Sequence, residues 1–217
     1  MAPCNKEQLA VFLITFFAYA AIHAMRTSWS YSKKLLQGQH GELYISNVQL
    51  GVTDTVFLLC YSFGFAFIAP LGDRYNRRRF LVAGYLVCLA GYLFYPVAYH
   101  FFGLGNVLFL IVSMGVSGLG SSVGVPGSMG ILDRWFHGGH KGLIIGLWTG
   151  CQCLGNIIGF ISSTIITQYL HLRWEYNFFY NGLVTLFLTI VTLYFLREEP
   201  FETDADNMGR ESVPSEE

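Results

Sequence analysis

The sequence predicts an all-α integral membrane protein whose helices cross the bilayer six times. Two features of the composition indicate this class: 53% of the 217 residues are hydrophobic, and only 12% are charged. Because a soluble domain usually carries about 25% charged residues, this chain has too little polar surface to face water on all sides. The third observation is that the apolar residues fall into six runs, each close to the roughly 20 residues that a spanning helix needs.

Polar or glycine-containing stretches separate the runs and set the expected bounds of each helix. The polar stretch 37–49 follows the first run, the basic cluster 72–79 follows the second, and a short turn around Gly103 follows the third. The polar segments 133–141 and 168–175 end the fourth and fifth runs. We therefore expect a six-helix domain over residues 9–197, with spans at about 9–34, 50–71, 80–99, 107–131, 142–166 and 177–196.

The distribution of lysine and arginine predicts that both ends of the chain lie in the cytoplasm. With the N-terminal segment 1–8 placed inside, nine basic residues fall in inner segments and at most four in outer ones. Cytoplasmic loops carry the excess of basic residues in membrane proteins. Residues 198–217, which hold eight of the fourteen acids, then form an acidic cytoplasmic tail.

Composition and motif content argue against several other functions. The formal net charge is −1 and the acids gather in the tail, so nothing supports binding to nucleic acid. The sequence has no nucleophile elbow, phosphate-cradling loop or metal-ligand cluster, so we expect no enzyme activity, no cofactor and no metal. The five cysteines sit in or beside apolar runs, and we expect free thiols.

Glycines four residues apart predict where the helices approach each other closely. Small residues at this spacing let helix backbones come together, since lipid gives helices no hydrophobic drive to associate. We interpret all of them as packing positions, and we expect Pro126 to break or kink the fourth helix. The glycines in question are Gly120 and Gly124 in the fourth run and Gly142, Gly146, Gly150, Gly155 and Gly159 in the fifth.

The loop between the second and third expected helices resembles a known signature. It runs Ala69-Pro-Leu-Gly-Asp-Arg-Tyr-Asn-Arg-Arg-Arg79, similar to the Gly-x-x-x-Asp-Arg-x-Gly-Arg-Arg-Arg loop of the major facilitator superfamily. Alanine is also small, and Asn76 tolerates the left-handed backbone that a glycine would provide. A plain positively charged anchor on the inner side is the alternative. The resemblance implies the six-helix N-terminal bundle of such a transporter, with a conformational role for Asp73, Arg74 and Arg77.

Further segments resemble the organophosphate:phosphate antiporters of that superfamily, in particular the eukaryotic sugar-phosphate exchangers. The first helix contains Tyr19-Ala-Ala-Ile-His-Ala-Met-Arg26, and the fifth contains Leu154-Gly-Asn156. Arg173-Trp-Glu175 precedes the sixth helix, which closes in Arg197-Glu-Glu-Pro200. Matches of this kind, in this order, run through most of residues 10–200.

One face of the first helix is suited to bind an anion. Tyr19, His23 and Arg26 stand at positions i, i+4 and i+7, which share a face. A guanidinium group binds two phosphate oxygens at once and stays charged. Spacing alone leaves an alternative open, in which Arg26 ends the apolar run and extends to the interface. The resemblance favours substrate binding, because Arg26 aligns with the phosphate-binding arginine of the family.

Residues of the second and fifth helices complete the expected site. Asp54 and Tyr61 are seven residues apart and share a face, and the resemblance places Tyr61 near the pocket. An acid within a span usually has an interior partner, here expected to be Arg26 or Lys34 in the empty carrier, although a capping role for Asp54 is equally open. Trp148 and Gln152 follow at a step of four. Bacterial relatives carry histidine at the position of Gln152, and glutamine binds phosphate or hydroxyls without titrating.

The favoured function is exchange of a phosphorylated sugar or another organophosphate for inorganic phosphate by alternating access. Two alternatives stay open: a truncated, non-transporting membrane protein that acts through helix association, and a facilitator for another small solute. Since the resemblance covers one six-helix half, we expect a second half or a second copy as partner, a tail that begins the linker between halves, and no exchange by the chain alone. The eukaryotic resemblance favours the endoplasmic reticulum membrane.

Overall fold

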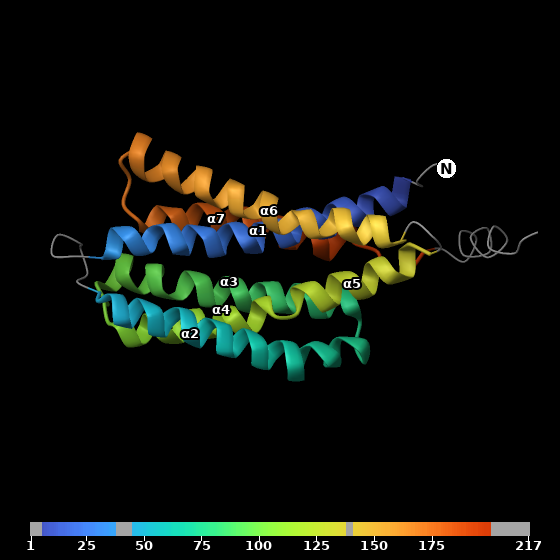
Figure 1. Ribbon diagram of the computed structural model, residues 1–217, viewed down its shortest axis with the longest axis horizontal. Coiled ribbons are helices and arrows are strands. Elements are labelled where there is room, and N and C mark those ends of the chain that lie inside the picture. The colour runs from blue at the N-terminus through green and yellow to red at the C-terminus, as the bar shows by residue number, and fades with distance from the viewer. Residues whose placement is uncertain (1–5, 38–44, 138–140, 201–217) are drawn as a thin grey trace, which may run out of the picture.

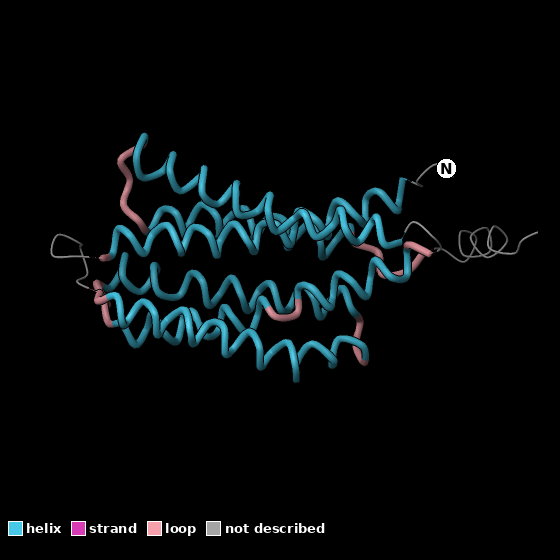
Figure 2. Tube along the Cα trace, viewed as in Figure 1, coloured by secondary structure: helices cyan, strands magenta, loops and turns pink. Residues whose placement is uncertain are grey.

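The computed structural model describes residues 6–37, 45–137 and 141–200, and nearly all of them are helical (Figures 1 and 2). Within these residues, six helical stretches are long and apolar enough to cross a membrane, which confirms the expected number of spans. Short helical segments extend two of the helices: η1 (Gly64–Ile68) and η2 (Ala69–Asp73) follow α2, and η3 (Ile165–Tyr169) follows α6. The helices are α1 (Lys6–Leu36), α2 (Asn47–Phe63), α3 (Arg77–Phe102), α4 (Val107–Ser121), α5 (Gly124–Trp135), α6 (Lys141–Thr164) and α7 (Glu175–Phe195).

The fourth span is divided into two helices, as Pro126 predicts. α4 ends at Ser121 and α5 begins at Gly124, so Pro126 occupies the first turn of α5. In a first turn the missing N–H of proline costs little, because that group has no partner within the helix. The break thus falls just before the proline, where the helix can restart without losing a hydrogen bond.

The helices form two groups that are separated in the view of Figure 1. α1 packs on α6 and α7 in one group, and α4 packs between α2 and α3 in the other. Contacts between α3 and α7, and between α1 and α5, join the groups. The start of α1, the end of η2 and the end of α5 lie at the same end of the molecule, where the sequence places the cytoplasm (Figure 1).

Glycines bring helix backbones together at the contacts of α3 with α4 and of α1 with α6. A Cβ atom added at Gly120 would lie 2.2 Å from the backbone nitrogen of Cys88, and one at Gly155 would lie 2.2 Å from the carbonyl oxygen of Ala20. For some glycines of α6 the expectation that they are packing positions is wrong. The step from Gly150 to Gly155 is five residues instead of four, so the glycines before this step lie on a different face of α6 from Gly155 and Gly159. No described atom lies within 4 Å of a Cβ added at Gly142, Gly146 or Gly150.

Side chains from two parts of the chain cap the start of α3. Asn76 accepts a hydrogen bond from the N–H of Arg79 at 2.9 Å, and it has a φ of −58°. It is therefore an ordinary N-cap, and the left-handed role expected for it is wrong. The Glu198 carboxylate accepts the N–H groups of Arg77 and Arg78 at 3.2 Å each, which suits the positive end of a helix. The first residue of the expected acidic tail is thus fixed to the start of α3, and 201–217 lie outside the described residues.

A pair of single cysteines tests the expected orientation. Tyr75 and Leu104 stand in loops at opposite ends of the molecule, with 67% and 43% of their surface exposed. In a background in which the five native cysteines are replaced, we expect an impermeant thiol reagent on the cytoplasmic side of sealed vesicles to label Tyr75→Cys and not Leu104→Cys. The reverse labelling pattern would invert the topology.

The two kinds of glycine on the structure predict different effects of the same small substitution. Gly120→Ala should lower the free energy of unfolding by about 2 kcal/mol or more, because its methyl group has no room against α3. Gly146→Ala meets open space, and since alanine favours helix by about 1 kcal/mol it should be neutral or stabilising. Unfolding of the purified chain in detergent measures both variants, and equal destabilisation by the two would contradict this packing.

Candidate functional site

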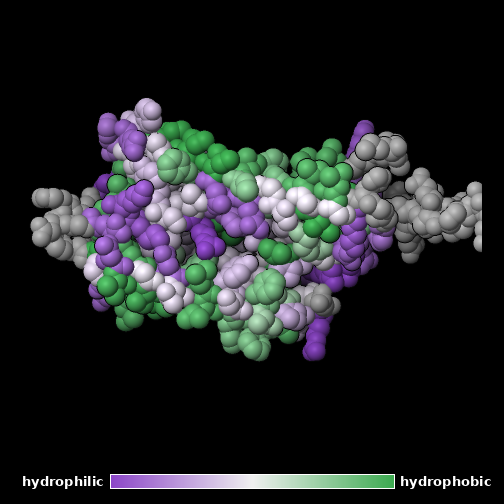
Figure 3. Space-filling view, in the orientation of Figure 1, coloured by the Kyte–Doolittle hydropathy of each residue, from purple (hydrophilic) through white to green (hydrophobic). Residues whose placement is uncertain are grey.

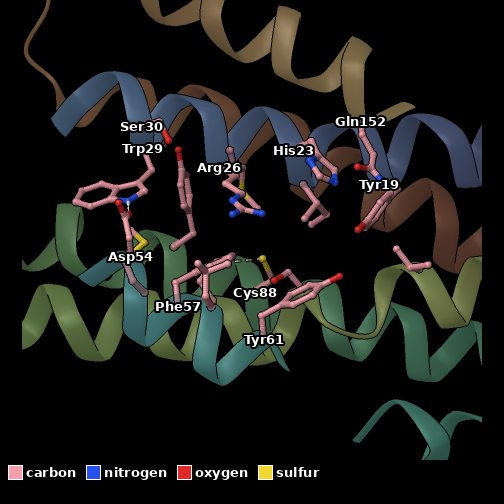
Figure 4. Close-up of a pocket in the computed structure, with 18 of the residues that line it drawn as sticks. Tyr19, His23, Arg26, Trp29, Ser30, Asp54, Phe57, Tyr61, Cys88 and Gln152 are labelled. Carbon is pink, nitrogen blue, oxygen red and sulfur yellow. Dashed lines mark hydrogen bonds between the residues drawn. The ribbon is translucent and has the colours of Figure 1, made fainter. Parts of the chain in front are cut away.

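A cavity of about 330 Å³ lies between the two helix groups. This volume is at the lower end of the range of roughly 300–1,000 Å³ that small-molecule sites occupy. Figure 4 shows the wall that α1 and α2 contribute, with Tyr19, His23 and Arg26 on α1 facing Asp54 and Tyr61 on α2. The structure therefore brings together the residues that the sequence assigned to two separate helix faces.

Arg26 extends into the cavity and lies over an aromatic ring of α2. Its guanidinium carbon is 5.1 Å from the centre of the Phe57 ring, a distance at which a cation is attracted to the ring face. Within the described residues no ion pair joins Arg26 to an acid. Its N–H donors are thus available to an anion that enters the cavity.

Tyr19 is held between two other aromatic side chains in the part of the cavity nearer the start of α1. Its ring stacks on that of Trp148 at 5.4 Å and meets the His23 ring edge-on at 4.9 Å. Trp148 is fully buried, donates its indole N–H to Thr15 at 3.2 Å, and does not line the cavity. The geometry makes it a support for Tyr19 from behind, so a direct contact between Trp148 and a ligand has no support here.

Neutral hydrogen-bonding groups complete this part of the cavity. The Tyr61 ring lies in a row along α2 and η1, 6.4 Å from the ring of Phe57 and 6.3 Å from that of Phe65. From this row its side chain reaches across to Tyr19 (Figure 4). Gln152 lines the cavity from α6. Hydroxyl and amide groups of this kind suit the uncharged, hydroxyl-bearing part of a ligand.

Asp54 has a different partner from the one expected. Lys33 lies 2.5 Å from one of its carboxylate oxygens, and the indole N–H of Trp29 donates to the other at 2.9 Å. The expectation of a pair with Arg26 or Lys34 is wrong, because Lys34 stands about 100° further round α1 and is exposed. The described residues that line the cavity thus include two fixed cations, Arg26 and Lys33, and one acid.

The residues of the signature loop lie outside the cavity, at the end of the molecule where α1 begins. Arg77 donates from its guanidinium to the carbonyl oxygen of Gly130 at 2.5 Å, which ties α3 to α5. Arg74 closes η2 through its backbone N–H and is exposed. The side chain of Asp73 lies outside the part of the chain that the structure describes. A conformational role for these three residues stays a prediction.

Several residues that line the cavity were not predicted from the sequence. Lys33 and Trp29 were left out although Lys33 stands seven residues after Arg26 and so shares its face. Cys88 and Tyr92 on α3, with Ser117 on α4, also line the cavity. Tyrosine at 85 and 92 in an apolar run gives a spacing of seven that could have shown the polar face of α3.

Comparison with known proteins matches the chain to one family and to relatives that are named as exchangers and transporters. The family model of the Major Facilitator Superfamily matches residues 9–215. "Sugar phosphate exchanger 3" of Mus musculus is 29% identical over 239 residues, which cover 98% of this chain and 47% of that protein. "Putative glycerol-3-phosphate transporter 3" of Arabidopsis thaliana is 31% identical over 226 residues, 95% of this chain and 42% of the relative. The chain thus spans less than half the length of these relatives.

Proposed function

The chain belongs to the major facilitator superfamily, and from this premise we propose that it forms the N-terminal half of an organophosphate transporter. The reaction we propose is exchange of a phosphorylated sugar or a similar organophosphate for inorganic phosphate. Similarity to a sugar phosphate exchanger and to glycerol-3-phosphate transporters supports this substrate class. The six apolar spans make the protein a multi-pass membrane protein, and for its location we propose the endoplasmic reticulum with both termini in the cytoplasm.

The observation that carries the proposal is Arg26 in the central cavity without an acidic partner among the described residues. A cation within a span is costly unless it faces a cavity or pairs with an anion. A phosphate group provides that anion and accepts the two parallel hydrogen bonds of a guanidinium. Tyr19, His23, Tyr61 and Gln152 then surround the remainder of the substrate as neutral partners. A facilitator for uncharged solutes would leave Arg26 without a function.

A second wall is needed to enclose the site. Figure 3 shows hydrophilic side chains along the region between the two helix groups, with hydrophobic surface on either side. Polar side chains of this kind avoid lipid, because the bilayer core does not hydrogen-bond to them. We propose that a second six-helix half, from a longer chain or from a second copy, covers this face, since transporters of this type bind substrate between two repeats.

Replacement of Arg26 by lysine tests the site. Arg26→Lys keeps the charge and loses the two hydrogen bonds that a guanidinium makes to one phosphate. In vesicles that contain the chain together with its proposed second half, we expect phosphate exchange to fall by about ten- to a hundredfold. Lys34→Arg is the matched control, an exchange of the same two cations on the same helix at an exposed position outside the cavity. Near-normal exchange by correctly inserted Arg26→Lys protein would refute the role of Arg26.

Reconstitution of the 217-residue chain by itself tests the need for a second wall. We expect no saturable exchange of glycerol-3-phosphate for inorganic phosphate in these liposomes, whereas vesicles that hold the carrier in its cellular assembly should exchange the two. Saturable exchange by the purified chain would show that two copies suffice, and it would exclude a non-transporting half.

A further inference from the structure

An ion pair lines the cavity at the end that points away from the expected cytoplasm. Lys33 on α1 and Asp54 on α2 form it. Trp29 donates to the same carboxylate, and Figure 4 shows Trp29 beside Asp54. The Lys33 ammonium also lies 5.7 Å from the centre of the Trp29 ring. Lysine is 20% exposed and the aspartate 41%, so water reaches both charges.

The same face of α1 carries both cations of the cavity, and α2 offers each a different partner. Arg26 and Lys33 are seven residues apart, about 10 Å along the helix axis. α2 places the ring of Phe57 below Arg26 and the carboxylate of Asp54 beside Lys33. Both cations have long, flexible side chains, so their charged ends can converge on one phosphate group between them.

We propose that Lys33 is a second substrate-binding cation, which Asp54 holds until the phosphate group of the substrate replaces the carboxylate. This inference rests on the proposed function. Asp54 acts through Lys33 and is a positioning residue that competes with the substrate for the same ammonium group. When Lys33 leaves, Asp54 keeps its hydrogen bond from Trp29, so the carboxylate still has a hydrogen-bond donor.

The exposure of the pair makes such a replacement feasible. Ion pairs that water reaches are weak, because solvent and dissolved ions screen them. A phosphate dianion carries twice the charge of the carboxylate, and together Lys33 and Arg26 match that charge. The charge of Asp54 stays close to the bound dianion and opposes it, which favours release of the substrate after translocation.

A structural clip between α1 and α2 is the competing explanation, and the two differ in the sign of their mutational effects. If Asp54 competes with the substrate, Asp54→Asn strengthens phosphate binding and Lys33→Gln weakens it. If the pair is a clip, loss of either partner loosens the same contact, and both variants impair exchange alike. The double variant adds a second distinction, since Asp54→Asn should have a smaller effect on phosphate binding once Lys33 is gone.

Kinetics of inorganic phosphate exchange, in vesicles that contain the carrier in its cellular assembly, measure these signs. We expect the KM for phosphate to fall about fivefold in Asp54→Asn and to rise about fivefold in Lys33→Gln, with Lys33→Arg close to the parent. Glu7→Gln removes the acid of the Glu7–Arg197 pair, which lies outside the cavity, and should leave KM unchanged. Changes of KM in the same direction in Asp54→Asn and Lys33→Gln would overturn the inference.

Tryptophan fluorescence of the purified carrier gives a readout that does not depend on turnover. Titration with sodium phosphate should change the emission of Trp29 as Lys33 leaves its ring, whereas sodium chloride at equal ionic strength should not. We expect Trp29→Phe and Lys33→Gln each to remove the response. A response that persists in Lys33→Gln would overturn the inference.

A parent carrier that neither exchanges phosphate nor responds to it would overturn the proposed function, and the inference with it. A parent that exchanges phosphate while Asp54→Asn keeps its KM would overturn the inference alone.

Discussion

The bilayer core does not hydrogen-bond to the protein, and this constraint governs where many polar side chains of the described helices are placed. Threonines on α7 donate hydrogen bonds from their hydroxyls to carbonyl groups of the same helix. Thr189, for example, donates to the carbonyl of Thr185 at 2.8 Å. Polar groups at helix contacts bond across them, and Asn181 on α7 donates to Ser28 on α1 at 2.9 Å. Such bonds hold helices together where hydrophobicity gives no preference for protein over lipid. Arg26 has neither solution within the described residues, and the cavity is the place left for it.

Close packing of α6 on one face of α1 leaves a neighbouring face of α1 for the cavity. Gly155 and Gly159 let α6 approach α1 so closely that a Cβ added at either would lie 2.2 or 2.4 Å from the carbonyl oxygen of Ala20 or Ala24. Small residues on that side of α1 are required for the same reason, since a larger side chain would separate the helices. Tyr19, His23 and Arg26 lie on a neighbouring face of α1 and line the cavity, and Tyr19 still stacks on Trp148 of α6. The close glycine contact and the open cavity are two consequences of one distribution of small and large residues along α1.

The helix count and the polar face of α1 were predictable because both depend on patterns within a single segment. Hydrophobic length gives a span, and spacing of seven gives a shared face. Partners between segments were harder to predict. Gly146 and Gly155 belong to similar glycine series, and the sequence does not show that only the second faces another helix. The partner of Asp54 was missed for the same reason, since it depends on how α1 and α2 are turned toward each other. The contact of Glu198 with α3 depends on where α7 ends in space, which no local pattern records.

The two helix groups are joined firmly on one side and weakly on the other. α3 packs on α7 through stacked aromatic rings, with Tyr92 and Phe178 4.6 Å apart, and Glu198 after α7 caps the start of α3. Opening these contacts would expose large rings and leave a helix end uncapped, so they are expected to persist. Across the cavity, α1 and α2 meet instead through a partly exposed ion pair, Lys33 with Asp54. A contact of that kind can exchange one anion for another without repacking a helix. The weak contact therefore lines the cavity that we propose as the substrate site, and the strong contacts hold the surrounding helices in place.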